Sequence, residues 1–100
     1  MKISKRELSA SFLLYRSFGG REVNLEEALS LLRKEMCLTR SSALNVVRRL
    51  QKLGFLDVRK KDESIVMLPH DPLRPLEAIS LSYLSSRKER CRTKNDLLNF

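Results

Sequence analysis

The chain lacks any uninterrupted apolar run near the roughly 20 residues that a bilayer-spanning helix requires. Its first residues alternate charged and apolar side chains, with Lys5, Arg6 and Glu7 ahead of Leu8. This alternation does not match the apolar region and cleavage site of a secretion signal. The sequence therefore predicts a cytoplasmic protein with no membrane partner.

Residue types that commonly carry catalysis or metal binding are also scarce, since the chain has one histidine, two cysteines and three glycines. His70 lies between two turn-forming residues without cysteines or carboxylates at a metal-ligand spacing, so we expect an exposed loop histidine. Cys37 and Cys91 form no CxxC pair, and we expect ordinary thiols, with Cys37 buried. No glycine-rich phosphate loop is present. The sequence thus predicts no enzyme, no cofactor, no metal site and no small-molecule ligand.

Acidic residues are few beside basic ones, because 20 Lys and Arg against 12 Asp and Glu give a formal charge of +8. A field of this sign attracts polyanions, and both nucleic acid and anionic membranes qualify. The excess is concentrated in residues 36–61, where Asp57 is the single carboxylate against seven cations. Residues 21–35 are slightly acidic. The chain is polarised, and its basic middle segment is the first candidate for a binding surface.

One hundred residues provide for one domain with one core, which we place at residues 1–92, followed by a tail at 93–100. The spacing of Leu8, Phe12 and Tyr15 predicts a first helix over 4–17, ended by Gly19-Gly20. A short extended piece at 21–23 precedes a second helix. Asn24 is its N-cap, with Glu27 at capping-box spacing.

Thr39 provides the N-cap of a third helix, which Gly54 closes. The β-prone runs 55–59 and 64–68 flank a polar tip and predict a hairpin. Pro69, Pro72 and Pro75 indicate a sharp turn, and a last helix is expected over 73–92 with Asp71 as a cap. The inward face of the third helix is expected to consist of Ala43, Val46, Val47, Leu50 and Leu53. The predicted fold class is mainly α with a small β-hairpin and an additional C-terminal helix.

The order of helices, hairpin and final helix, together with the string Ala43-Leu44-Asn45-Val46-Val47-Arg48-Arg49-Leu50-Gln51-Lys52-Leu53-Gly54-Phe55-Leu56, resembles the winged helix-turn-helix superfamily. The string looks like the end of a recognition helix running into the first wing strand, as in MarR-like and PadR-like regulators and small archaeal regulators. The turn before Thr39 lacks the glycine found in many such units. The resemblance implies a recognition helix at 39–53, a wing at 59–64, and a dimer formed through terminal helices.

Burial of one face of the third helix turns Ser41, Asn45, Arg48 and Lys52 outward, because they recur at i, i+4, i+7 and i+11. Short polar residues at the N-terminal end followed by cations are typical of a helix that enters a major groove N-terminus first. The candidate DNA-binding residues are Thr39, Arg40, Ser41, Ser42, Asn45, Arg48, Arg49 and Lys52 on the helix, with Arg59, Lys60 and Lys61 on the wing.

The last helix carries an apolar stripe of Leu76, Ile79, Tyr83 and Leu84, which can pack on the domain's own core or pair with a second copy. We expect a homodimer through this stripe. A basic cluster of Arg87, Lys88, Arg90, Arg92 and Lys94 follows it, and the helix dipole alone favours cations there.

The leading hypothesis is sequence-specific binding of double-stranded DNA by a dimeric transcriptional regulator. One alternative is an architectural protein that coats DNA with little regard to sequence. Another is an interaction module, in which the last helix would be the working surface and the cations would serve solubility. An RNA-binding role has less support, because the aromatic side chains follow core-like spacing and offer no stacking platform.

Overall fold

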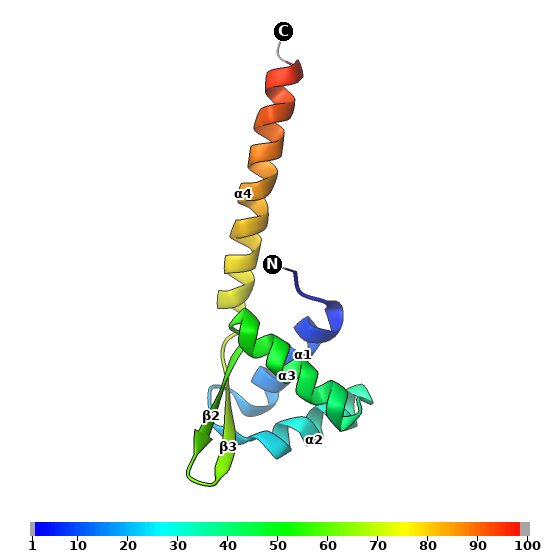
Figure 1. The fold of residues 1–100 in the computed structure, drawn as a ribbon, viewed down its shortest axis with the longest axis vertical. Coiled ribbons are helices and arrows are strands. Elements are labelled where there is room, and N and C mark those ends of the chain that lie inside the picture. Colours follow the sequence, from blue (N-terminus) through cyan, green and yellow to red (C-terminus); the bar gives the residue numbers. More distant parts are fainter. Residues whose placement is uncertain (1, 99–100) are drawn as a thin grey trace.

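The computed structural model describes the backbone of residues 2–98 and the side chains of residues 2–90. The elements are α1 (Lys5–Phe18), β1 (Val23–Asn24), α2 (Leu25–Met36), α3 (Arg40–Leu53), β2 (Leu56–Lys61), β3 (Ser64–Pro69) and α4 (Leu73–Leu98). The predicted fold class is therefore confirmed. Figure 1 shows α1, α2, α3 and the β2–β3 hairpin forming one body, from which α4 projects as a long single helix.

Helix α1 begins with a reciprocal cap, in which the Ser4 hydroxyl accepts from the Glu7 N–H at 3.1 Å and the Glu7 carboxylate accepts from the Ser4 N–H at 2.9 Å. Ala10 and Ser11 are buried on its inward face, whereas Phe12, one of the residues whose spacing predicted this helix, is 45% exposed. The Ser11 hydroxyl donates to the Leu8 carbonyl at 2.7 Å, so its burial leaves no polar atom unpaired. Small side chains on this face let α1 pack closely on the other helices.

The sheet has the antiparallel order β1-β3-β2, so the predicted extended piece before α2 becomes a third strand. Val23 pairs with Met67, and the β2–β3 hairpin pairs from Leu56 opposite Pro69 down to Lys61 opposite Ser64. Strand β2 runs two residues further toward the tip than predicted, whereas β3 begins at Ser64, as predicted. Two turn residues close the hairpin, and one of them, Asp62, takes a φ of +56°. Aspartate tolerates this left-handed conformation better than most residues, so a two-residue turn suffices.

The core lies between the three helices of the body and the inner face of the sheet. All five predicted inward residues of α3 are buried, as are Leu14 of α1, Leu29 and Leu32 of α2, and Met67 of β3. Asn24 caps α2 as predicted, with its side chain accepting from the Glu26 N–H at 2.9 Å, but the predicted capping box with Glu27 does not form. The packing of α3 on this core fixes which of its side chains face outward.

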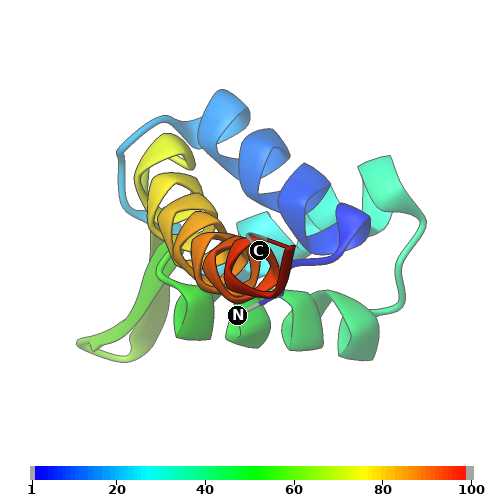
Figure 2. The ribbon, with the colours of Figure 1, turned by 90° about the horizontal axis from the view of Figure 1, so that it is seen from above.

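Helix α4 starts as predicted, with the Asp71 carboxylate accepting from the Leu73 N–H at 3.0 Å. Pro75 lies in the first turn, where its missing N–H would have had no helical partner. The helix passes the predicted end at residue 92, since no glycine or proline interrupts it before Leu98. Figure 2 shows α4 rising between α1 on one side and α3 on the other. In the described part of the chain, no helix combines the length and apolarity needed to cross a bilayer.

Residues 99 and 100, and the side chains of the predicted tail at 93–100, lie outside what the structure describes. The same holds for the side chains of Cys91 and of Arg92 and Lys94 in the basic cluster. The described members of that cluster, Arg87, Lys88 and Arg90, are exposed.

Candidate nucleic-acid interface

Helix α3 is defined at both ends by its own sequence. The Thr39 hydroxyl accepts from the Ser42 N–H at 3.1 Å, and Gly54 ends the helix with a left-handed φ of +88°. Thr39 also donates to the Ser42 hydroxyl at 3.0 Å, so these two predicted DNA-binding residues have a local role in capping. The cap and the buried inner face together fix the orientation of α3 about its own axis, and so determine which of its side chains face solvent.

The turn that leads into α3 passes through Cys37, which takes the left-handed conformation, with φ +53° and ψ +38°, at the end of α2. The expectation of a buried thiol is wrong, because Cys37 is free and exposed. It occupies the position where many helices place glycine. The chain reverses there at the surface, which leaves its side chain in solvent.

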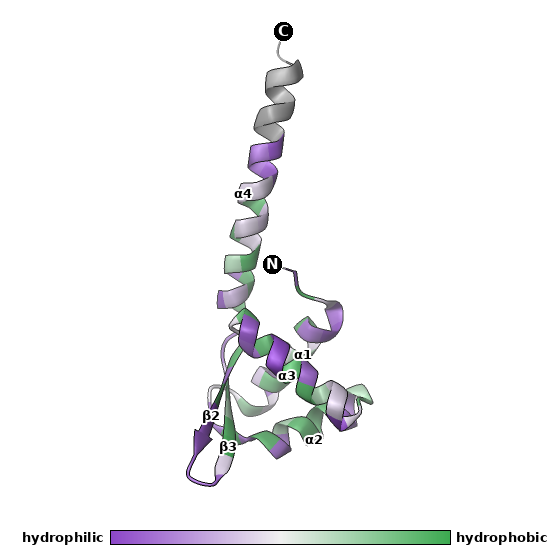
Figure 3. Cartoon of the chain, in the orientation of Figure 1, coloured by the Kyte–Doolittle hydropathy of each residue, from purple (hydrophilic) through white to green (hydrophobic). Residues whose placement is uncertain are grey.

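The predicted outward row of α3 is confirmed in its orientation, since Ser41, Asn45, Arg48 and Lys52 are all exposed. Figure 3 shows hydrophilic residues along the outer side of α3 and on β2, whereas β3 is largely hydrophobic. Among residues 2–90, neither Arg48 nor Lys52 has a carboxylate within ion-pair distance. No carboxylate of the described residues therefore neutralises these two cations.

Arg40, at the start of α3, is bound differently. Its Nη2 pairs with Oε1 of Glu26 at the start of α2, and the two side chains remain 55% and 65% exposed. A pair this exposed contributes at most about 1 kcal/mol, because water screens it. An incoming anion can therefore compete with Glu26 for Arg40. Glu26 was not predicted to lie beside this site, although it belongs to the acidic segment 21–35.

Arg49 does not belong to the outward row. Its Nε lies 3.2 Å from Oε2 of Glu7, and its Nη2 donates to the Lys2 carbonyl at 2.9 Å. Burial alone would raise the pKa of Glu7, but hydrogen bonds from Ser4 and the Arg49 guanidinium stabilise the carboxylate and hold its pKa below the usual value. Arg49 therefore ties α3 to α1 and to the N-terminal arm.

The three predicted wing cations lie on β2 and do not share one face, because successive side chains of a strand point to opposite sides. Arg59 lies 3.8 Å from Asp57, and Lys61 lies 3.6 Å from Glu22. Lys60 has no ion pair within the described part of the chain. The hairpin therefore offers one unpaired cation and two whose charge is partly compensated.

His70 is half-buried rather than freely exposed. Its ring Nε2 lies 3.0 Å from Oδ2 of Asp57, and its backbone N–H donates to the Phe55 backbone carbonyl at 3.0 Å. These contacts fasten the end of β3 to the start of β2. Within residues 2–90, three or more His, Cys, Asp or Glu side chains nowhere gather in a way that could hold a metal ion.

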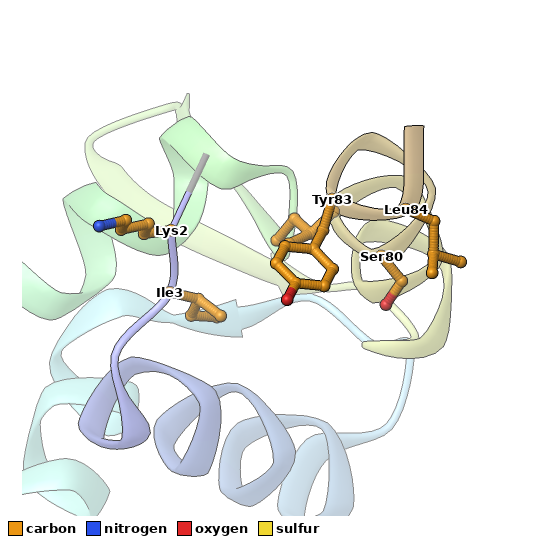
Figure 4. Close-up of a pocket in the computed structure, with 6 residues that line it drawn as sticks. Lys2, Ile3, Ser80, Tyr83 and Leu84 are labelled. Carbon is orange, nitrogen blue, oxygen red and sulfur yellow. The ribbon is translucent and has the colours of Figure 1, made fainter. Parts of the chain in front are cut away.

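The structure divides the predicted dimer stripe of α4. Leu76 and Ile79 are partly buried against the domain's own core, while Tyr83 is 63% and Leu84 58% exposed. Figure 4 shows Tyr83 directed toward Ile3 of the N-terminal arm and Leu84 pointing away from the arm. An open groove lies between the N-terminal arm and α4, and it is lined by Lys2, Ile3, Ile79, Ser80, Tyr83 and Leu84. The stripe is therefore not one continuous outward face.

No model of a known protein family matches the chain, and no curated protein matches its sequence.

Proposed function

We propose that this protein binds double-stranded DNA by placing α3 in the major groove, with the β2–β3 hairpin against the flanking backbone. The observation that supports this most is the unpaired outward row of Ser41, Asn45, Arg48 and Lys52 on a helix with both ends capped. The major groove is wide enough for one helix, and nearly all of the outer side of α3 is free to enter it. The resemblance to winged helix-turn-helix regulators agrees with this assignment.

The residues of the row suit different parts of the duplex. Asn45, in the N-terminal half of α3, can pair bidentately with adenine, and Ser41 can bond to base edges or phosphate. Arg48 and Lys52 lie one and two turns further along and suit phosphate, although arginine also recognises guanine. Arg40 joins the contact if it exchanges Glu26 for phosphate. Lys60 is the hairpin cation best suited to add to these contacts, since it has no ion pair among the residues that the structure describes.

We further propose that the protein is a sequence-specific transcriptional regulator that acts in the cytoplasm as a homodimer. Two-fold DNA sites favour dimers, because each half-site then adds its binding energy to that of the other. An architectural DNA-coating protein is the alternative with the same surface. Selection of bound duplexes from a random pool separates the two: a regulator enriches one motif, whereas a coating protein enriches none.

Charge reversal on α3 tests DNA binding itself. In the double variant Arg48→Glu, Lys52→Glu, we expect at least about a ten-fold loss of affinity for duplex DNA. The slope of log affinity against log salt concentration should also become shallower by the amount that about two phosphate contacts contribute. The matched control is Arg6→Glu, Arg16→Glu, which changes the net charge equally on exposed positions of α1, on the other side of the domain from α3 (Figure 2).

The control should bind nearly as the parent does, apart from a small uniform loss due to net charge. If both double variants lose affinity equally, net charge and not α3 carries the binding. If the α3 variant folds and binds as well as the parent, the DNA assignment is wrong, and an interaction module becomes the better account.

A further inference from the structure

Helix α4 has an apolar face that the domain does not cover. Leu73 is 65% exposed, and Leu81 and Leu84 are each 58% exposed. At about 100° per residue these three side chains lie within about 80° of one another around the helix. Leu76 and Ile79, which pack on the core, lie roughly a third of a turn away. The uncovered face therefore differs from the stripe that the sequence indicated.

The projecting part of α4 is not buried by the residues that the structure describes. Every described side chain from Ser80 to Arg90 is exposed, and Figure 1 shows the helix leaving the body of the protein. A helix in water gains most of its stability by burying an apolar face against another element. The face formed by Leu73, Leu81 and Leu84 requires such an element.

Two charged residues lie on the same face as the leucines. Glu77 lies between Leu73 and Leu81, and Lys88 lies one turn beyond Leu84, both within the same 80° sector. Neither has an ion pair among the residues that the structure describes. Going along the face, the order is apolar, acidic, apolar, apolar, basic. When a second copy of this face runs in the opposite direction, its basic residue comes opposite the acidic residue of the first copy.

We propose that two copies of α4 pair antiparallel through the face formed by Leu73, Glu77, Leu81, Leu84 and Lys88. Leu81 of each copy lies opposite Leu84 of the other, and Glu77 of each lies opposite Lys88 of the other. Leu81 and Leu84 of both copies form the centre of the contact, and a Glu77–Lys88 ion pair lies on either side of this centre. The contact is the same for both copies, as a closed two-fold dimer requires.

A parallel pairing is disfavoured by charge. It would place Lys88 beside Lys88 and Glu77 beside Glu77, and it would bring the neighbouring cations Arg87 and Arg90 of both copies together. Like charges directly opposed destabilise a pair of helices, whereas opposite charges at flanking positions set partner and direction. The antiparallel arrangement separates the two basic clusters along the axis.

The overlap in this register covers about 20 residues of α4, or about 30 Å. It places the two bodies at opposite ends of the helix pair. Each α3 lies beyond the base of its own α4 (Figure 1), so the two recognition helices are more than about 30 Å apart. This pairing extends the homodimer in the proposed function, but it does not depend on DNA, and its test uses none.

The first test measures the mass of the full chain in solution by light scattering and sedimentation. The parent is expected at twice the chain mass of 11.6 kDa, and Leu84→Glu is expected at 11.6 kDa. Ser82→Glu is the matched control, since it adds the same charge two residues away on the opposite side of α4, and it should stay dimeric. A monomeric parent, or a dimeric Leu84→Glu variant, would overturn the proposal.

The second test establishes direction by disulfide trapping in a background without Cys37 and Cys91. Glu77→Cys combined with Lys88→Cys should form a covalent dimer, and neither single variant should. In one helix these positions are about 16 Å apart, so they cannot bond to each other. If either single variant forms a covalent dimer instead, the helices are parallel and the proposed register is wrong. Both tests leave the α3 surface unchanged, so their failure does not affect the DNA assignment.

Discussion

The Glu26–Arg40 pair allows a substitution to strengthen DNA binding while slightly weakening the fold. Glu26→Gln removes the carboxylate that Arg40 contacts and keeps the side chain nearly the same size. Because the two partners are 55% and 65% exposed, the pair contributes about 0.2–1 kcal/mol. We therefore expect the free energy of unfolding to fall by less than about 1 kcal/mol in urea titrations.

Binding should change in the opposite direction. Arg40 would no longer have to leave Glu26 before contacting phosphate, and one negative charge near the duplex would be gone. The same 0.2–1 kcal/mol corresponds to about a 1.4- to 5-fold increase in affinity, measured by fluorescence anisotropy at fixed salt. The gain should shrink as salt is raised, because screening weakens both the pair and the phosphate contact.

Glu27→Gln is the control for this prediction. It makes the same change in charge one residue further along α2, in the same first turn, on a side chain with no ion pair in the described residues. If Glu26→Gln lowers affinity below this control, Glu26 orients Arg40 instead of competing for it. If the two variants bind equally, Arg40 does not contact DNA.

Three further predictions concern the framework of α3. Glu7→Gln should lower the free energy of unfolding by up to about 1 kcal/mol at pH 7. Because the pKa of Glu7 is held below 4.5, the difference in stability from the parent should shrink as the pH falls below that value. A constant difference across an acid titration would contradict this. Leu50→Ala should cost about 2–5 kcal/mol, since this side chain is fully buried, and a loss below about 1 kcal/mol in urea would exclude the packing described. Gly54→Ala should lower stability by about 1–2 kcal/mol in thermal melts, because an L side chain is strained at its φ of +88°. Steric overlap adds nothing, since an added Cβ would lie 4.0 Å from its nearest neighbour, a Pro75 carbon, which is an ordinary contact. An unchanged melting temperature would show that this conformation is not required.

Local signals explain why α3 could be predicted closely. Its cap at Thr39, its end at Gly54 and the apolar period between them all lie within the segment itself. The outward row follows from these by geometry. The hairpin was predicted for the same reason, although pairing with β3 carries β2 two residues further toward the tip than predicted.

Features that depend on distant residues could not be predicted in this way. Arg49 looked like a neighbour of the outward row, but Glu7, 42 positions earlier, draws it toward α1. The buried face of α1 also depends on what packs against it: the spacing of Phe12 predicts a helix, but Ala10, Ser11 and Leu14 are the residues that the body buries. On α4, the body covers Leu76 and Ile79, and the uncovered face therefore joins Leu84 of the predicted stripe to Leu73 and Leu81, which were not predicted.

The central claim is that α3 is the surface that contacts duplex DNA, and mapping by nuclear magnetic resonance tests it most directly. During titration of the labelled full chain with a short duplex, amide signals of residues 39–53 and of the hairpin near Lys60 should shift in a salt-dependent way. Signals from the outer side of α1 around Phe12 should remain unchanged. If the shifts instead cluster on α1 or α4 and leave residues 39–53 unaffected, the assignment of α3 as the binding surface is contradicted.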